Sequence, residues 1–364
     1  MGVKQEREPA DMPTPALDEA KRQLAVCNAC RYCEGFCAAF KAMTRYRAFD
    51  TETVVHMSNL CHNCQACYHS CQFTDPHEFD LNLPRALATV RVESWESHIP
   101  FPGASKIFQS SPLVTLVTVL VVAALFWLIA EIPWASSATF YDLISHEALV
   151  LIFSPLFLLP LLILFIGLAR YWRTVNGESI TWSQLCESLR SAATLKNLDG
   201  GAGQGCNYEK EDRYSQVRRW AHQATMYGFL LCFAATSVAT VMHYGMGLVA
   251  PYPFLSLPKL LGVSGGLLLT LGTSKLIYLK TKANVLLESP GRRGSDYGFI
   301  TLLWFVSTTG LLLYWLGGTK LSSSMLILHL ASIACLFISI PFSKMVHGFF
   351  RMAALIREAQ LRGA

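Results

Sequence analysis

Eight cysteines near the start of the chain fall into two copies of one pattern, C-x2-C-x2-C-x3-C. The first copy is Cys27, Cys30, Cys33 and Cys37, and the second is Cys61, Cys64, Cys67 and Cys71. This spacing is typical of [4Fe–4S] cubes, in which three thiolates of one run bind one cluster and the fourth binds the other. We expect one cluster on Cys27, Cys30, Cys33 and Cys71, and a second on Cys61, Cys64, Cys67 and Cys37. Two such clusters would lie close enough to pass single electrons.

Zinc and disulfides are the alternatives for a segment so rich in cysteine. Structural zinc usually takes two separated C-x2-C pairs, so a third cysteine three residues further on has no tetrahedral role. Disulfides need an oxidising compartment and cannot easily bridge such tight spacings. The repeated spacing therefore favours paired clusters. The other cysteines are scattered, and cysteine in an apolar run is usually a small buried hydrophobe; they are Cys186, Cys206, Cys232 and Cys335.

Four histidines carry a second chemical signal. His222 and His243 lie at opposite ends of one apolar segment, and His329 and His347 lie at opposite ends of another. Eighteen residues make five helical turns, so His329 and His347 are expected on one face of one helix, about 27 Å apart. If the two segments run antiparallel, His222 meets His347 and His243 meets His329. Each pair could supply both axial ligands of a b-type haem.

Arginines near the first of these pairs fit the same interpretation. Arg218, Arg219 and Arg351 lie within one helical turn of His222 or His347, where guanidinium groups could bind haem propionates. The alternatives stay open, because histidines and arginines at a membrane boundary are often interfacial groups. We expect one or two haems, with no haem as the remaining possibility. His146 is an alternate ligand or a candidate for a quinone site.

The elements that position these residues are helical and mostly apolar. The chain is 52% hydrophobic, and six segments reach the ~20 residues needed to cross a bilayer as a helix. They are 111–131, 148–170, 221–244, 258–280, 297–317 and 324–346. The predicted fold is therefore all-α, a small two-cluster ferredoxin-like domain followed by a six-helix transmembrane bundle. Pro155 and Pro160 kink the second span, and Gly262 and Gly266 allow close helix packing in the fourth.

The positions of lysine and arginine predict the orientation. The segments 132–147 and 245–258 contain neither residue, whereas the opposite side receives most of the cations of the membrane half. The positive-inside rule makes that cationic side cytoplasmic, together with both termini. Residues 1–20 are polar and acidic, unlike a cleavable signal. These loop cations account for the net charge of +5, so no nucleic-acid partner is implied.

The remaining segments divide the chain further. We expect a disordered segment at 1–20, the cluster domain at 21–110, the membrane domain at 111–350 with a cytoplasmic loop at 171–220, and a cytoplasmic tail at 351–364. A helix is expected over Lys41–Leu60, and a turn over His77–Pro84 leads into a helix near 84–97. The glycine-rich stretch Gly200–Tyr208 lacks nucleotide-binding spacing. We expect it to cover a cluster, dock a partner or be flexible.

These motifs together resemble a known family. The two cysteine runs, His77–Pro84, the glycine-rich stretch ending in Cys206–Tyr208, and Arg219–His222 are similar to those of the tricarballylate/citrate-utilization protein B family. The membrane half is similar in plan to the haem-bearing gamma subunit of respiratory nitrate reductases. The resemblance implies a protein of the bacterial inner membrane that takes electrons from an FAD-dependent flavoprotein dehydrogenase. It would pass them through the clusters and haem to membrane quinone.

Other functions compete with this expectation. The chain has no acid/base or nucleophilic constellation, so any organic oxidation would belong to a partner, as for tricarballylate dehydrogenase in that family. This chain would then be an electron-transfer subunit of an oxidoreductase. The alternatives are a thiol–disulfide subunit similar to membrane heterodisulfide reductases, in which Cys206 would react, an organic-acid transporter, and a redox sensor. A transporter would need charged residues within its spans, and these are almost absent.

Overall fold

The computed structural model describes residues 14–101, 103, 111–130, 143–200, 203–208 and 213–363. In chain order its helices are α1 (Pro15–Cys30), α2 (Ala38–Met43), α3 (Thr51–Leu60), α4 (Ala66–His69), α5 (Leu83–His98), α7 (Pro112–Ala130), α8 (His146–Thr174), α9 (Trp182–Thr194), η3 (Lys196–Leu198), α10 (Val217–Met246), α11 (Leu257–Lys282), η4 (Val285–Leu287), α12 (Arg293–Trp315), α13 (Ser322–Ser339), η5 (Ile340–Phe342) and α14 (Val346–Gly363). The described residues contain no strand, only an isolated bridge between Cys206 and Ser215. The all-α prediction is confirmed.

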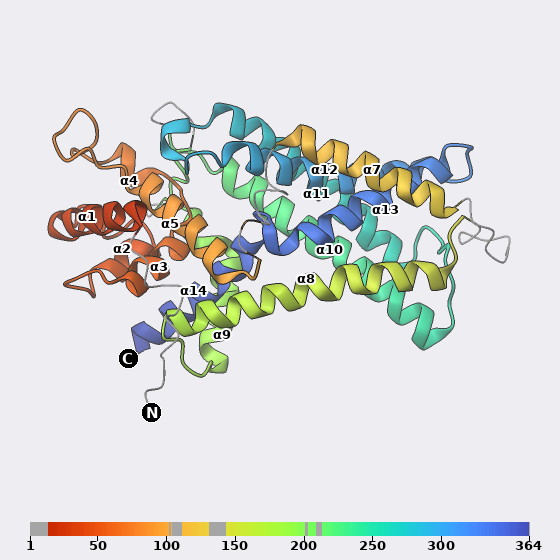
Figure 1. The fold of residues 1–364 in the computed structure, drawn as a ribbon, viewed down its shortest axis with the longest axis horizontal. Helices are drawn as coiled ribbons and strands as arrows, with labels where there is room; N and C mark the ends of the chain where they lie inside the picture. Colours follow the sequence, from red (N-terminus) through yellow and green to blue (C-terminus); the bar gives the residue numbers. More distant parts are fainter. Residues whose placement is uncertain are drawn as a thin grey trace.

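The molecule is elongated, with its short and long helices at opposite ends (Figure 1). Helices α1–α5, which carry the cysteine runs, gather at one end, and α14 lies beside them. The long helices α7, α8 and α10–α13 extend from there toward the other end. The chain therefore builds a small helical domain on the end of a helical bundle.

Two predictions for the small domain were wrong. Helix α1 begins at Pro15, where the Thr14 side chain accepts a hydrogen bond from the amide of Leu17, so residues 15–20 are ordered. Residues 1–13 lie outside the described part of the chain. The helix expected over 41–60 is divided between α2 and α3. Asp50 makes a new start, because its carboxylate accepts a hydrogen bond from the amide of Thr53 at 2.7 Å.

The turn expected over 77–84 does lead into a helix. Asn82 accepts a hydrogen bond from the amide of Arg85, and α5 follows from Leu83 to His98. This helix lies between the cysteine runs and the membrane half, since it packs on α1, α3 and α8.

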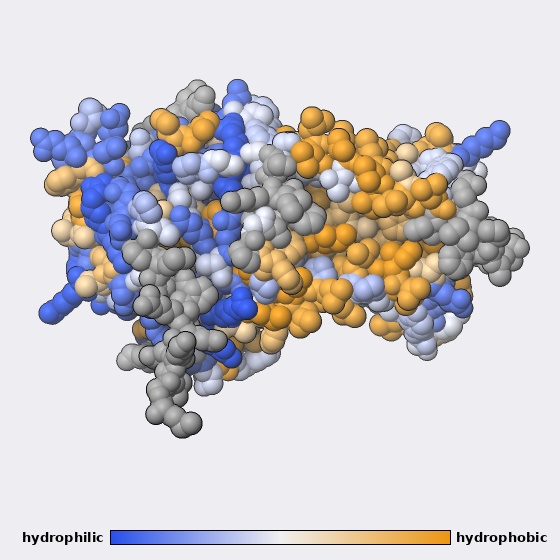
Figure 2. Space-filling view, viewed as in Figure 1, coloured by the Kyte–Doolittle hydropathy of each residue, from blue (hydrophilic) through white to orange (hydrophobic). Residues whose placement is uncertain are grey.

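Five helices are long and apolar enough to cross a membrane in the described part of the chain. They are α8, α10, α11, α12 and α13 with its extension through η5. The first predicted span, 111–131, forms α7, which is apolar but shorter, and residues 131–142 lie outside the described residues. Apolar residues gather over these helices in Figure 2, whereas polar residues cover the end that holds α1–α5. These features are those of a membrane protein.

The sixth predicted span is not one continuous helix. Helix α13 ends at Ser339, η5 follows through Phe342, and Ser343 is extended before α14 begins at Val346. Pro341 has no amide hydrogen to donate within the helix, which explains the break. The prediction that His329 and His347 share one face of one helix was therefore wrong. His347 belongs to α14.

Helix α14 joins the two parts of the molecule. Residues 351–363, expected as a tail, belong to it, and it packs against α3, α8 and α9. One buried apolar core contains Leu24 of α1, Val54 of α3, Tyr171 of α8 and Phe350 of α14. Burial of this shared apolar surface holds the cysteine domain against the bundle.

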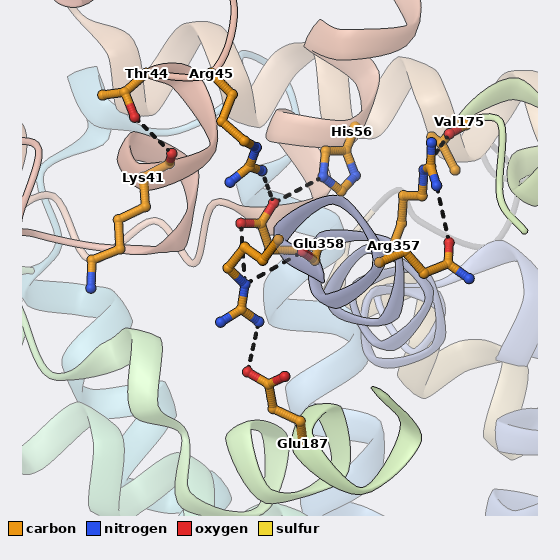
Figure 3. Close-up of polar contacts among 10 residues, drawn as sticks. Lys41, Thr44, Arg45, His56, Val175, Glu187, Arg357 and Glu358 are labelled. Atoms are coloured by element: carbon orange, nitrogen blue, oxygen red, sulfur yellow. Dashed lines mark hydrogen bonds and ion pairs between the residues drawn. The ribbon is translucent and has the colours of Figure 1, made fainter. Parts of the chain in front are cut away.

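Ion pairs reinforce this attachment of α14, as Figure 3 shows. Glu358, only 3% exposed, binds the guanidinium of Arg45 and lies 3.5 Å from Nε2 of His56 on α3. Arg362 pairs at the surface with Glu187 of α9 at 2.7 Å. The helix is thus anchored on two sides.

Candidate functional site

The fourth cysteine of the second run lies with the first three of the first run. Burial, followed by the proximity of Cys71, Cys33 and Cys30, raises the pKa of Cys27 to about 12. A cavity of about 300 Å³ lies among these side chains and is lined by Cys27, Cys30, Cys33 and Cys71. The structure therefore brings the first expected ligand set together around a space.

The second expected set also converges, with the roles of the runs exchanged. Burial, and then the nearby Cys61 thiol, raises the pKa of Cys37 to about 11. Burial and the nearby Cys37 thiol raise the pKa of Cys64. Burial, followed by the Cys64, Cys61 and Cys37 thiols, raises the pKa of Cys67. Cys37 thus groups with the second run. Neutral thiols in such crowded, buried groups become thiolates only when a cationic group is bound among them.

The cysteine side chains do not come close enough together for a single ion. Sulfur ligands at about 2.3 Å from zinc lie within about 4 Å of one another. Among the described residues, no three His, Cys, Asp or Glu side chains converge closely enough for one ion. All twelve cysteines are free.

Backbone amides support the sulfur ligands. The amide of Asn63 donates to Cys61 Sγ and that of Phe73 donates to Cys71 Sγ, both at 3.4 Å. Such donors would stabilise negative charge on the sulfurs of an iron–sulfur group bound by these cysteines.

The two cysteine groups differ in their access to solvent. Cys30 is exposed, and the neighbouring Tyr32 is 72% exposed. Cys64 is only 7% exposed, because the segment around Cys206 covers it and the amide of Asn207 donates to the Cys64 carbonyl at 3.0 Å. The first group therefore faces water, and the second faces the interior.

The glycine-rich stretch covers the second group. Gly205 has φ +101°, and a Cβ there would lie 2.3 Å from the Ser215 carbonyl oxygen, so only glycine permits this close backbone approach. Tyr214 bonds Ser70 at 3.0 Å, which ties the segment to the second run. The glycines thus serve the fold of the segment. Of the expected roles, the structure supports cluster covering.

Cys206 lies in the wall of the second group as a neutral thiol. It is 2% exposed, its Sγ donates to the Leu198 carbonyl at 3.3 Å, and burial raises its pKa. Reactive cysteines need an accessible thiolate. This environment does not favour the thiol–disulfide alternative.

The inner histidine pair meets as predicted. The rings of His222 and His347 lie 5.9 Å apart between centroids, with an interplanar angle of 88°. Two imidazoles on opposite sides of one metal, with bonds of about 2 Å, have ring centres roughly 6 Å apart. His347 Nδ1 contacts the Lys344 carbonyl, which makes Nδ1 the donor and leaves the lone pair on Nε2. His222 Nδ1 is buried without a hydrogen-bond partner. This pair could hold a haem iron.

Each outer histidine has a different neighbour from the one predicted. His243 stacks on His146, with ring centroids 4.2 Å apart and an interplanar angle of 17°. His329 packs on α12, where its Nδ1 lies 3.1 Å from Thr309 Oγ1 and where Gly310 leaves space for the ring. Imidazole lone pairs lie in the ring plane, so two stacked rings cannot both ligate an iron between them. The predicted pairing of His243 with His329 is therefore not found.

The expected propionate arginines contact other groups. Arg218 Nη1 donates to the Asn63 carbonyl at 2.6 Å, and Arg351 Nη2 donates to the Cys61 carbonyl at 2.8 Å. Arg219 instead pairs with Asp199 at 2.9 Å. Arg218 and Arg351 therefore bind the loop of the second cysteine run.

One arginine of this region escaped the sequence analysis. Arg91 of α5, 8% exposed, also donates to the Cys61 carbonyl. His62 is buried directly after Cys61, and its Nδ1 bonds the Leu60 carbonyl at 2.8 Å. A signal for Arg91 existed, since it shares one helical face with the apolar Leu87.

Comparisons with known proteins agree with this arrangement. Residues 20–97 match the Fer4-like domain of citrate utilization protein B, and residues 107–364 match the citrate utilization protein B family. The chain is 40% identical over 348 residues to citrate utilization protein B of Escherichia coli, covering 94% of this chain and 91% of that relative. No solved structure matches the chain.

Proposed function

The chain belongs to the citrate utilization protein B family, and from this membership we propose that it transfers electrons from a cytoplasmic FAD-dependent dehydrogenase to membrane quinone. The relatives carry a Fer4-like domain, which supports an iron–sulfur electron-transfer role. The donor would be a flavoprotein of the tricarballylate dehydrogenase type. One observation carries the proposal. The two cysteine groups, each completed by a cysteine of the other run, lie between the solvent-exposed surface and the His222–His347 pair.

The flavoprotein would dock on the side of the first cysteine group. Cys30 and Tyr32 are exposed there, and the cavity among the cysteines opens beside them. Reduced flavin carries two electrons, whereas each [4Fe–4S] cluster accepts one at a time. Cys27, Cys30, Cys33 and Cys71 would hold the first cluster, and Cys37, Cys61, Cys64 and Cys67 the second.

One turn of α10 and one turn of α14 connect the second cysteine group to the inner histidines. Arg218 and His222 are four residues apart on α10, and His347 and Arg351 are four residues apart on α14. In each case the arginine binds the loop of the second cysteine run one turn from the histidine. This proximity supports electron transfer from the second cluster to a haem between His222 and His347.

We propose a single b-type haem on this inner pair. The 5.9 Å ring separation suits two axial ligands, and His347 already has the required tautomer. The haem would provide a one-electron centre inside the membrane half. The His146–His243 stack supports no second haem and leaves His146 as a candidate for a quinone site.

The proposed location is the bacterial inner membrane, with the cysteine domain and both termini in the cytoplasm. Apolar helices supply the membrane half, and cationic residues cluster at the end nearest the cysteine domain, among them Lys280, Arg292, Arg293 and Lys344. This distribution follows the positive-inside rule.

Cofactor content tests the proposal. Anaerobically purified protein should contain eight irons in clusters, acid-labile sulfide and one extractable b-type haem. His222→Ala should lose the haem and keep the clusters, whereas the control His243→Ala should keep both. Protein without sulfide would refute the cluster assignment. Retention of haem in His222→Ala would refute the ligand assignment.

A turnover assay tests the electron route. Reduced flavoprotein should support quinone reduction by the wild-type protein in nanodiscs, and His222→Ala should lose most of this rate. Equal quinone reduction by the variant would show that electrons leave by another path.

A further inference from the structure

Three arginines from three helices converge on the loop of the second cysteine run. Arg91 of α5 and Arg351 of α14 both donate to the Cys61 carbonyl, and Arg218 of α10 donates to the Asn63 carbonyl. Arg91 is buried, and the other two are partly buried. These hydrogen bonds hold three positive charges beside the loop that carries Cys61, Cys64 and Cys67.

Within the described part of the chain, none of these three charges has a carboxylate partner. No Asp or Glu oxygen of the described residues lies within 4.0 Å of Arg91, Arg218 or Arg351. Other cations at this end of the bundle are paired. Arg219, adjacent to Arg218, binds Asp199, and Lys280 binds both Glu288 and Asp296. Arg218 also lies over the Tyr208 ring and Arg91 over the Trp95 ring, but neither contact neutralises a charge. Charges held away from water without a counter-ion are costly, so an anion bound beside this loop would be stabilised.

The first cysteine run is surrounded differently. Arg31 Nε donates to the Asn28 carbonyl at 2.9 Å, but this arginine is exposed to water. Arg22, also near this end of the domain, pairs with Glu19 at 2.7 Å. Water and carboxylates screen these charges. The two runs have the same spacing, but the cations near the first run are exposed or paired, and those beside the second run are buried or partly buried without a carboxylate among the described residues.

A [4Fe–4S] group with four thiolates is anionic, and accepting an electron makes it more negative. Nearby positive charges in a poorly solvated site stabilise the more negative state. The three arginines therefore favour the reduced state of the second group, whereas no comparable charges favour that of the first.

We propose that Arg91, Arg218 and Arg351 set the reduction potential of the second cluster above that of the first, and so direct electrons inward. This inference rests on the proposed function. One electron leaves the first cluster and enters the second, and no proton is exchanged. The arginines act through charge and position. They touch the loop, and none of them is a ligand.

Redox titration of full-length, cofactor-loaded protein tests the proposal. Arg91→Gln, Arg218→Gln and Arg351→Gln remove one charge each, and glutamine can still donate a hydrogen bond. Anaerobic titration followed by electron paramagnetic resonance should give two midpoint potentials for the clusters of the wild-type protein, one for each cluster. Each variant should lower the higher midpoint by at least 59 mV, a tenfold change in a one-electron equilibrium. The lower midpoint should stay unchanged.

Arg31→Gln is the control, because Arg31 also donates to a carbonyl of the first run but is exposed to water. It should move neither midpoint. Arg91→Lys keeps the charge and should keep the wild-type potentials. If one glutamine variant loses iron, the glutamine variants at the other two positions still test whether loss of a positive charge lowers the higher midpoint. Arg91→Lys then tests whether the charge alone preserves it.

The opposing outcomes are distinct. An unchanged higher midpoint in all three glutamine variants, or an equal shift in Arg31→Gln, overturns the proposal. A shift confined to the haem midpoint, read from optical spectra, would assign the arginines to haem propionates instead. Wild-type protein without iron would refute the proposed function itself, before any potential is measured.

Discussion

Replacing Glu358 by glutamine should detach α14 locally from the cysteine domain. Glu358 is 3% exposed, and its carboxylate binds Arg45 and faces His56 on α3. Breaking a buried ion pair by removing one partner costs about 3–5 kcal/mol. The Arg45 side chain is 28% exposed and can regain water, so we expect a smaller cost of about 2–3 kcal/mol in the free energy of local opening.

Amide hydrogen exchange in nanodiscs measures this opening directly. A loss of 2–3 kcal/mol corresponds to about 30- to 150-fold faster exchange of the α14 amides. Helices α11 and α12, which do not contact Glu358, should exchange at the wild-type rate. Local measurement is needed because unfolding of the whole membrane protein need not be two-state.

The matched control is Glu187→Gln on α9. Glu187 binds Arg362 of the same helix at 2.7 Å, but the two side chains are about half exposed. Exposed pairs contribute about 0–1 kcal/mol, so exchange should rise by less than about fivefold. Equal acceleration in the two variants, or none in Glu358→Gln, would refute the reasoning that burial makes the Glu358 contact strong.

Three further outcomes follow from other parts of the structure. Acid should loosen the same α14 contact: burial lowers the pKa of His56, which faces Glu358, Arg45 and Arg357, below 6.5, and the contacts with His56 and Arg45 hold the pKa of Glu358 below 4.5 despite its burial. Since the unfolded state then binds more protons, stability should fall as pH drops below about 6.5 and again below about 4.5, seen as faster α14 exchange. Cys206→Ser should keep wild-type iron content and quinone reduction, because its buried thiol donates to the Leu198 carbonyl and accepts a long contact from Arg218, and a hydroxyl can do both; loss of turnover with iron retained would favour the thiol–disulfide alternative. Gly228→Ala should lower the thermal unfolding midpoint, at a cost of about 1–3 kcal/mol, because its Cβ would lie 2.4 Å from the Leu269 amide nitrogen; Gly262→Ala, with 3.6 Å to Ala235 Cβ, should be tolerated, and equal midpoints would contradict this packing argument.

Short-range patterns predicted much of this structure. The cysteine runs fix their own ligand spacing, and long apolar segments mark α8 and α10–α13, so these features follow from residues close along the chain. The meeting of His222 and His347 also followed, because it needs only the ends of two antiparallel segments to coincide.

Features that depend on packing between helices could not be read in the same way. The partner of His243 is His146, which depends on how α8 and α10 are rotated about their axes. A close contact between α10 and α11 uses Gly228 and Gly265, whereas the sequence analysis selected Gly262 and Gly266. Glu358 and Arg91 are charged residues at buried positions, and only their partners on distant segments explain them.

Helix α14 has a consequence for how the protein is made. It carries His347, Arg351 and Glu358, which contact α10, the second cysteine run and α3. Helices α1–α5 leave the ribosome long before α14 does. The cysteine domain is therefore synthesised before α14, against which it packs in the folded protein, and the intervening helices enter the bilayer in between. Under the proposed function, clusters would be inserted into that domain before membrane assembly, and α14 would join it to the membrane helices last.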